Sequence, residues 1–151
     1  MALTLWRQRH PEDLHILEGV ILGGGLANFK RDDGNQDVAK NRLYKILITE
    51  SAHLIWVLRC ERRIANGDNP RDHHTAQAVE GRWLRKINER LQIDCLLTNK
   101  FLYERKALKT KKVYYTWTKC STNTEDFHQE WCRNPGVLVG MESRCPPGRN
   151  R

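Results

Sequence analysis

Apolar side chains recur at helical spacing through the middle of the chain. Between residues 39 and 65, positions three and four apart fall on one stripe when each residue turns by about 100°. The stripe consists of Leu43, Ile46, Leu47, Leu54, Val57, Leu58 and Ile64. Residues 66–72 follow with Gly, Asn and Pro, which are helix stop signals. This pattern predicts one long helix over residues 39–65.

Two further segments are helical by the same criterion. The predicted second helix covers residues 75–97, and its stripe consists of Ala76, Val79, Trp83, Ile87 and Leu91. A third helix is predicted over residues 99–119, although the β-branched and aromatic residues at 113–117 suit a strand equally well.

The N-terminal part has a less regular pattern. Residues 2–9 read as the last turns of a helix that ends at His10-Pro11, and so abrupt a start suggests that a segment once preceded it. Residues 16–29 are apolar but broken by a run of three glycines at 23–25, which favours a short strand or an irregular buried segment over a phosphate-binding loop. Residues 30–37 read as a loop. We therefore expect a mainly α-helical single domain over residues 1–140 and a disordered tail over 141–151.

The first long helix carries polar groups on its apolar stripe. Glu50 and Glu61 project onto the centre of the stripe, and His53 lies three residues after Glu50. These residue types can perform acid–base chemistry or bind metal. Eleven residues of helix span about 16 Å, however, so the two carboxylates cannot share one metal ion.

Structural ion pairs are the alternative role for these groups. Arg90 and Asp94 lie four residues apart near the centre of the second stripe. A pair that joins Glu50 or Glu61 to Arg90 across the two helices would satisfy buried charges that are costly when unpaired. We therefore expect Glu50, Glu61, Arg90 and Asp94 to form structural ion pairs, with catalysis by Glu50 and His53 as the minor alternative.

A second cluster has ligand chemistry suited to zinc. Cys120, His128, Cys132 and Cys145 have the spacing C-x7-H-x3-C-x12-C. It lacks the tight C-x2-C step of common zinc modules, so free thiols and a surface histidine are the favoured interpretation. We predict neither a metal nor another cofactor.

Most of the net positive charge of the chain lies in the third predicted segment. The 151-residue chain has a net charge of +8, and residues 100–119 contain seven basic residues and one acidic residue. No apolar run approaches the length of a membrane span, no secretory signal is recognisable, and five irregularly spaced cysteines suggest reduced thiols. We therefore expect an anionic partner, no membrane contact, and a location in the nucleus or cytoplasm.

Aromatic residues alternate with the cations of this basic segment. Such a mixture is typical of nucleic-acid binding, in which cations contact phosphates and rings stack on bases. A solvated basic helix face with its aromatic residues in the core is the alternative. The predicted contact residues are Lys106, Lys109, Lys111 and Lys112, with Tyr114 or Trp117 as stacking groups.

Longer stretches of the chain resemble a known family. They are RLYKILITESAHLIWVLRCERRI (42–64), RWLRKINERLQIDCLLTNK (82–100), VILGGGLANFK (20–30), and TW, W and VLVG between residues 116 and 140. Together they resemble the C-terminal region of fungal non-LTR retrotransposon polyproteins, which contain reverse transcriptase or ribonuclease H-like domains. In such polyproteins this region lies downstream of the catalytic domains.

The catalytic parts of that family do not carry over. A reverse transcriptase needs an aromatic-x-Asp-Asp turn to hold two metal ions, but the stretch Phe29-Lys30-Arg31-Asp32-Asp33 is out of register by one residue. The resemblance implies a non-catalytic remnant of such a polyprotein or a free-standing copy of its terminal domain. Together with the basic segment, it leads us to expect an accessory module that binds RNA or DNA and can accompany the polymerase part of the parent polyprotein. A structural, partner-docking domain without nucleic-acid contact is the alternative.

Overall fold

The computed structural model describes residues 1–10, 23, 26–65, 67, 69–118, 120, 132 and 139. Within them the protein is mainly helical, as predicted, and the only β-type pairing between two described residues is an isolated bridge between Lys30 and Gln36. The predicted tail at 141–151 and most of the Gly-rich segment lie outside the described residues.

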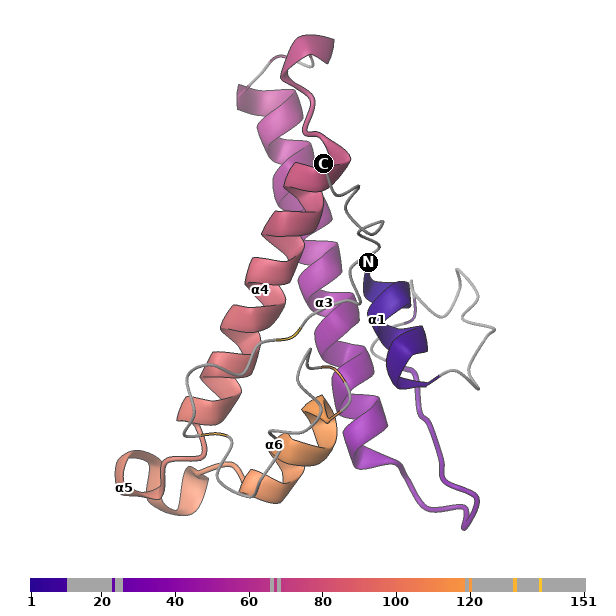
Figure 1. Ribbon diagram of the computed structural model, residues 1–151, viewed down its shortest axis with the longest axis vertical. Helices are drawn as coiled ribbons and strands as arrows, with labels where there is room; N and C mark the ends of the chain where they lie inside the picture. Colours follow the sequence, from indigo (N-terminus) through magenta and orange to yellow (C-terminus); the bar gives the residue numbers. More distant parts are fainter. Residues whose placement is uncertain are drawn as a thin grey trace, which may run out of the picture.

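Two long antiparallel helices form the long axis of the molecule (Figure 1). Helix α3 spans Val38–Cys60, and helix α4 spans Ala76–Leu96. Each begins at a side-chain cap: the Asp37 carboxylate accepts a hydrogen bond from the Lys40 N–H at 2.9 Å, and the Thr75 hydroxyl accepts one from the Ala78 N–H at 3.2 Å. Both predicted long helices are therefore confirmed, with ends within a few residues of those expected.

The end of α3 departs from the prediction. A π-helical turn, Glu61–Ala65, follows Cys60, and a short 3-10 helix, Pro70–Asp72, leads to α4. Ile64 was expected on the buried stripe but is 82% exposed. The wider π turn rotates the side chains after Cys60 away from the apolar stripe of α3, because each π turn contains more residues than an α turn.

The basic third segment is broken where a continuous helix was predicted. Helix α5, Lys100–Tyr103, is followed by the 3-10 turn Glu104–Lys106, and helix α6, Thr110–Trp117, begins after a short link. The break occurs at Glu104, which has a φ of 44°. The Leu108 N–H then donates to the Leu97 carbonyl at 2.8 Å, which folds the chain back along the end of α4. The strand alternative for residues 113–117 is wrong.

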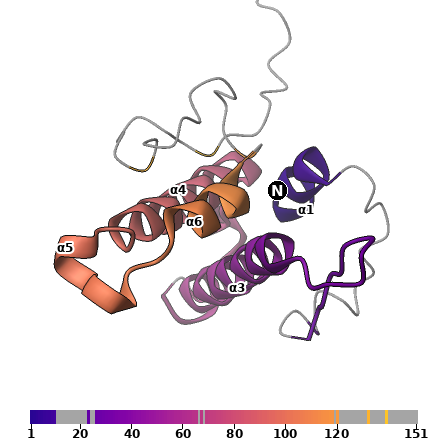
Figure 2. The ribbon, with the colours of Figure 1, turned by 90° about the horizontal axis from the view of Figure 1, so that it is seen from below.

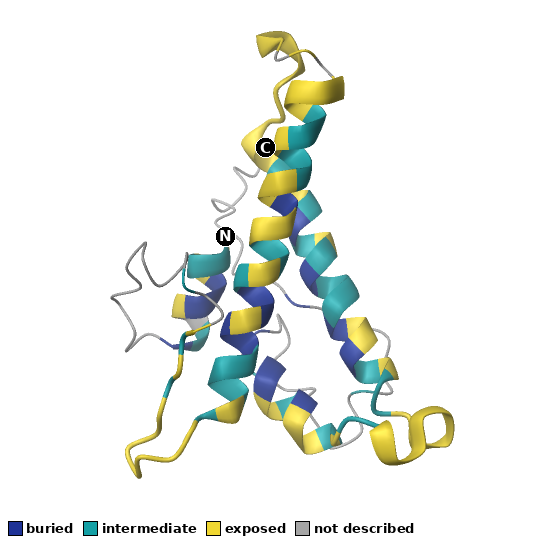
Figure 3. Cartoon of the chain, turned by 180° about the vertical axis from the view of Figure 1, so that it is seen from behind, coloured by how far each residue is buried: buried dark blue, intermediate teal, exposed yellow. Residues whose placement is uncertain are grey.

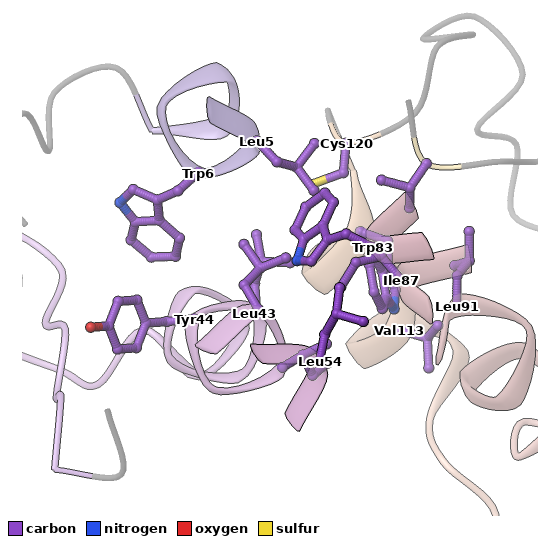
Figure 4. Packing of buried hydrophobic residues seen from close by; sticks show 14 residues of the cluster. Leu5, Trp6, Leu43, Tyr44, Leu54, Trp83, Ile87, Leu91, Val113 and Cys120 are labelled. Atoms are coloured by element: carbon purple, nitrogen blue, oxygen red, sulfur yellow. The ribbon is translucent and has the colours of Figure 1, made fainter. Parts of the chain in front are cut away.

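Helix α6 packs between the diverging ends of α3 and α4 (Figure 2). The core forms where these helices meet, and Figure 4 shows its side chains converging from all of them. Its fully buried members include three tryptophans, and the polar edge of Trp83 is satisfied because its Nε1 donates to the Ser51 hydroxyl at 2.8 Å. The core residues with 0–2% exposure are Leu5, Trp6, Leu43, Tyr44, Leu47, Trp83, Ile87, Leu91, Val113, Trp117 and Cys120.

Helix α1, Ala2–Arg9, packs on α3 through an aromatic cluster. The ring of Trp6 lies 5.3 Å from that of Tyr44 and 5.1 Å from that of Phe29, while Phe29 and Tyr44 are 5.2 Å apart. Tilted and edge-on rings at these separations attract one another beyond their burial of area. The predicted helix over residues 2–9 is thus confirmed, and its aromatic cluster attaches it to the core.

Burial decreases along the long axis. The buried residues gather in the half that contains α1 and α6, whereas the opposite ends of α3 and α4 are mostly exposed (Figure 3). None of the helices described here is both long and apolar enough to span a bilayer. The half that contains α5 and α6 combines the core with the most basic segment of the chain.

Candidate nucleic-acid interface

Four exposed lysines precede or begin helix α6. Lys106 lies in the 3-10 turn, Lys109 is the N-cap residue of α6, and Lys111 and Lys112 lie in its first turn. All four side chains are exposed, and among the described residues none of them forms an ion pair. We call these four residues the lysine surface. The four predicted contact residues lie within seven residues of the chain, and all of them are solvent-accessible.

The start of α6 makes this surface more favourable for anions. No side chain caps the helix at Lys109, so the first N–H groups of α6 keep their positive partial charge. Basic side chains in the first turn oppose the helix dipole. An anion placed there would be attracted both by these side chains and by the free N–H groups. The arrangement costs stability in the free protein and favours a bound phosphate.

Trp117 cannot stack on bases. Its side chain is fully buried, and its Nε1 donates a 2.7 Å hydrogen bond to the Asp94 carboxylate. Val113, Thr116 and Trp117 form the buried face of α6, at the i, i+3 and i+4 spacing of an amphipathic helix. The prediction for Trp117 is therefore wrong, and this spacing was the signal in the sequence that could have placed it in the core.

Other aromatic side chains are more accessible. Tyr114 is half-buried and contacts Tyr115 edge-on at 5.3 Å, whereas Tyr115 is 54% exposed. Phe101 is 97% exposed on α5, next to Lys100 in the chain. Phe101 was not among the predicted stacking groups, because a continuous helix over 99–119 gave no reason to expect that the side chains at 100–106 would project into solvent.

Asp94 forms a buried ion pair with Arg42, which was not among the predicted ion-pair residues. The Arg42 guanidinium donates to its carboxylate at 2.6 Å, and the other carboxylate oxygen accepts from Trp117. Asp94 is fully buried, and the Arg42 side chain is 16% exposed. The group thus connects α3, α4 and α6 through one carboxylate, and each of its oxygens has a donor.

Glu61 also forms an ion pair, with Arg82 and not with the predicted Arg90. Two parallel hydrogen bonds of 2.6 Å join the carboxylate to the guanidinium, and His74 Nε2 lies 2.9 Å from the same carboxylate. The hydrogen bonds from Arg82 hold the pKa of Glu61 below its ordinary value and raise the pKa of Arg82. This bidentate contact fastens the end of α3 to the start of α4.

Glu50 and His53 do not form a catalytic arrangement among the described residues. Glu50 is half-buried and, in that part of the chain, its carboxylate neither forms an ion pair nor accepts a hydrogen bond. His53 is exposed, and its ring lies 6.2 Å from that of Trp56. The predicted pairing of Glu50 with Arg90 is wrong, since no carboxylate of the described residues forms an ion pair with Arg90.

That cleft lies between the first half of α3, the end of α4 and the start of α6. It has a volume of about 440 Å³ and four basic side chains: Arg42, Lys45, Arg90 and Lys112. Its remaining lining residues, Gln36, Val38, Asn41, Ile46 and Thr49, are uncharged, so none of the described residues that line it is acidic. We call it the basic cleft. Lys112 belongs to both the basic cleft and the lysine surface.

The candidate zinc residues are only partly described. Cys120 is buried in the core, and burial raises its pKa to about 12. Cys132 accepts a hydrogen bond from Cys95, which lowers the pKa of Cys132 and raises that of Cys95. His128 and Cys145 lie outside the described residues. Across the part of the chain that is described, no three His, Cys, Asp or Glu side chains gather as metal ligands would.

Basic side chains without acidic neighbours thus lie at two adjoining places of the described structure, the lysine surface and the basic cleft. Comparison with known proteins adds no further assignment: the chain matches no protein-family model, no curated protein and no solved structure.

Proposed function

We propose that this protein is a non-catalytic nucleic-acid-binding module. In this proposal RNA or DNA is held mainly through its phosphates, without readout of base sequence. The observation that carries the proposal is the lysine surface, in which four exposed cations lie within seven residues and have no acidic partner in the described structure. Backbone phosphates are the chemistry that such a surface attracts.

The position of these lysines supports a role in binding over one in stability. Lysines near a helix N-terminus oppose the dipole of the helix, so they do not stabilise α6 in the free protein. The core of the same helix, formed by Val113 and Trp117, accounts for its folding. The cations are therefore free to contact a ligand while the buried face of α6 keeps them in place.

A retroelement origin is part of the proposal. It is supported by the motifs over residues 20–30, 42–64 and 82–100, which resemble the C-terminal region of fungal non-LTR retrotransposon polyproteins. The test is genomic: an in-frame or decayed polymerase domain encoded directly upstream of Met1 would support it. An unrelated gene at that place in several intact copies would contradict it.

A salt titration tests nucleic-acid binding. The logarithm of the association constant for a single strand should fall linearly with the logarithm of the salt concentration. Replacing Lys106, Lys109, Lys111 and Lys112 with Gln should reduce that slope by up to about 3, at about 0.7 for each phosphate that is no longer neutralised. Absence of binding at low salt, or binding that does not change with salt, would contradict the proposal.

A matched control removes the same charge elsewhere. Arg7, Arg59, Arg71 and Arg85 are exposed and lie outside both the lysine surface and the basic cleft. Their combined replacement with Gln lowers the net charge by the same four units. Affinity should then fall much less than in the lysine variant, because the lysines still touch the strand. Equal losses in the two variants would mean that only net charge matters.

Docking onto a protein partner is a second candidate function, and the exposed apolar residues of α5 favour it. Phe101 and Leu102 are 97% and 70% exposed, and Leu96, the last residue of α4, is 62% exposed. The variant Phe101→Leu separates the two functions, because it keeps an apolar side chain and removes the aromatic ring. Stacking on bases contributes about 1–3 kcal/mol per base, so the nucleic-acid proposal expects weaker single-strand binding. Unchanged binding would favour docking to protein at this position.

A further inference from the structure

The basic cleft has the composition of a site for a small anion. Its four basic side chains come from three separate helices: Arg42 and Lys45 from α3, Arg90 from α4 and Lys112 from α6. The fold thus brings together cations that are up to 70 residues apart in the chain. The volume of about 440 Å³ lies within the range of small-molecule sites and exceeds what one water or one bare ion needs.

The charge of the cleft is largely uncompensated. Asp94 neutralises Arg42, but in the described part of the chain no carboxylate lies within ion-pair distance of Lys45, Arg90 or Lys112. Like charges that converge on one cleft repel one another and destabilise the free fold. A ligand with one or two negative charges would remove that repulsion, and no described protein group does so.

The two guanidiniums of the cleft are incompletely satisfied. Arg42 Nη1 and Arg90 Nε are buried and have no hydrogen-bond acceptor in the described structure. Asp94 accepts a hydrogen bond from Arg42 Nη2, which fixes the orientation of that guanidinium. Planar guanidiniums bind phosphate oxygens through paired N–H groups, and lysine contributes a more flexible point charge. Two of each in one cleft fit a phosphate group better than a carboxylate-bearing side chain.

We infer that the basic cleft is a binding site for a nucleotide phosphate, into which a bound RNA or DNA strand places one of its phosphate groups. The inference deepens the proposed function and rests on it. Lys112 joins the cleft to the lysine surface, so a strand that crosses the lysines reaches the cleft without a gap. The lysine surface then supplies general attraction, and the cleft fixes one phosphate in position.

Adenosine 5′-monophosphate and inorganic phosphate are suitable probes, because they can occupy the cleft but cannot span the lysine surface. Titration of the full chain, followed by NMR, should give saturable shifts around Arg90 and Lys45 with both probes. The double variant Lys45→Gln/Arg90→Gln should bind the nucleotide at least about tenfold more weakly. It should also reduce the salt slope for a short single strand by about 0.7, because the one phosphate held in the cleft is no longer neutralised.

Three further variants serve as controls. Arg59→Gln/Arg85→Gln removes one exposed charge from each of the same two helices outside the cleft, and nucleotide binding should not change. Arg90→Lys keeps the charge, so nucleotide affinity should fall while the salt slope stays the same. Lys106→Gln/Lys109→Gln/Lys111→Gln should weaken strand binding and leave nucleotide binding intact.

The outcomes separate the two proposals. If neither probe binds saturably, or if the cleft double variant binds both as well as the unaltered protein does, the inference is wrong, and strand binding by the lysine surface can still stand. If the nucleotide binds in the cleft and no strand binds at low salt, the module proposed above is wrong, and the cleft serves free nucleotides.

Discussion

At the scale of single residues, one buried carboxylate determines how three helices meet. Asp94 is fully buried and accepts hydrogen bonds from Arg42 on α3 and Trp117 on α6. The sequence indicated that Asp94 needs a partner, because a charge on an apolar stripe is costly when alone. It did not indicate which one, since whether Arg42 reaches Asp94 depends on the rotation of α3 relative to α4.

The variant Asp94→Asn tests this role. It keeps the shape of the side chain but removes the charge, so Arg42 is left largely buried without its counter-ion. We expect the free energy of unfolding to fall by about 3–5 kcal/mol, the usual effect of breaking a buried pair. Urea denaturation followed by circular dichroism measures it. Asp32→Asn, in an exposed loop, is the matched control, and equal effects of the two variants would contradict the structural role.

At the scale of elements, the sequence predicted the two long helices well and the basic segment poorly. Helices α3 and α4 have long apolar stripes and clear caps at Asp37 and Thr75, which are local signals. The break at Glu104 has no such signal, because glutamate favours helices and rarely adopts a positive φ. The hydrogen bond from Leu108 to the end of α4 holds the chain in a reversal that overrides this local preference.

The variant Glu104→Gly should stabilise the protein. A non-glycine residue at φ 44° carries backbone strain of about 1–3 kcal/mol, and the greater freedom of glycine in the unfolded chain offsets part of the gain. We expect a net increase of about 1 kcal/mol in the free energy of unfolding, seen as a higher urea midpoint. Glu104→Ala removes the same carboxylate without relieving the strain. If alanine stabilises the protein as much as glycine, the effect is one of charge.

The contact between Glu61 and Arg82 should make the α3–α4 junction sensitive to acid. Its hydrogen bonds hold the pKa of Glu61 below its ordinary value of 4.5. The stabilisation is therefore fully present above that value and is lost as the pH falls through the lower pKa of the folded state. Glu61→Gln should lower the melting temperature at neutral pH, and its difference from the unaltered protein should shrink below about pH 4.5. A difference that grows on acidification would contradict this assignment, and Glu80→Gln on exposed α4 surface is the control.

At the scale of the whole molecule, stability and charge are concentrated in the same half. The core, the lysine surface and the basic cleft all lie toward the end that contains α6, while the opposite ends of α3 and α4 have few buried side chains (Figure 3). The packed core around α6 holds in position the cations that come from three helices. The far ends of α3 and α4, joined mainly by Glu61 and Arg82, contribute little to that core.

Hydrogen exchange should therefore show a gradient along the long axis. Amides at residues 43–54 and 83–94 contact the core and should exchange only through global unfolding, whereas those at 55–60 and 76–82 should exchange through local opening. Two variants separate these processes. Ile87→Ala removes a fully buried side chain, costs about 2–5 kcal/mol, and should accelerate the slow amides while leaving those of the far end unchanged. Glu61→Gln should accelerate exchange at the far end and leave the slow amides unchanged. Uniform protection along both helices would contradict the gradient.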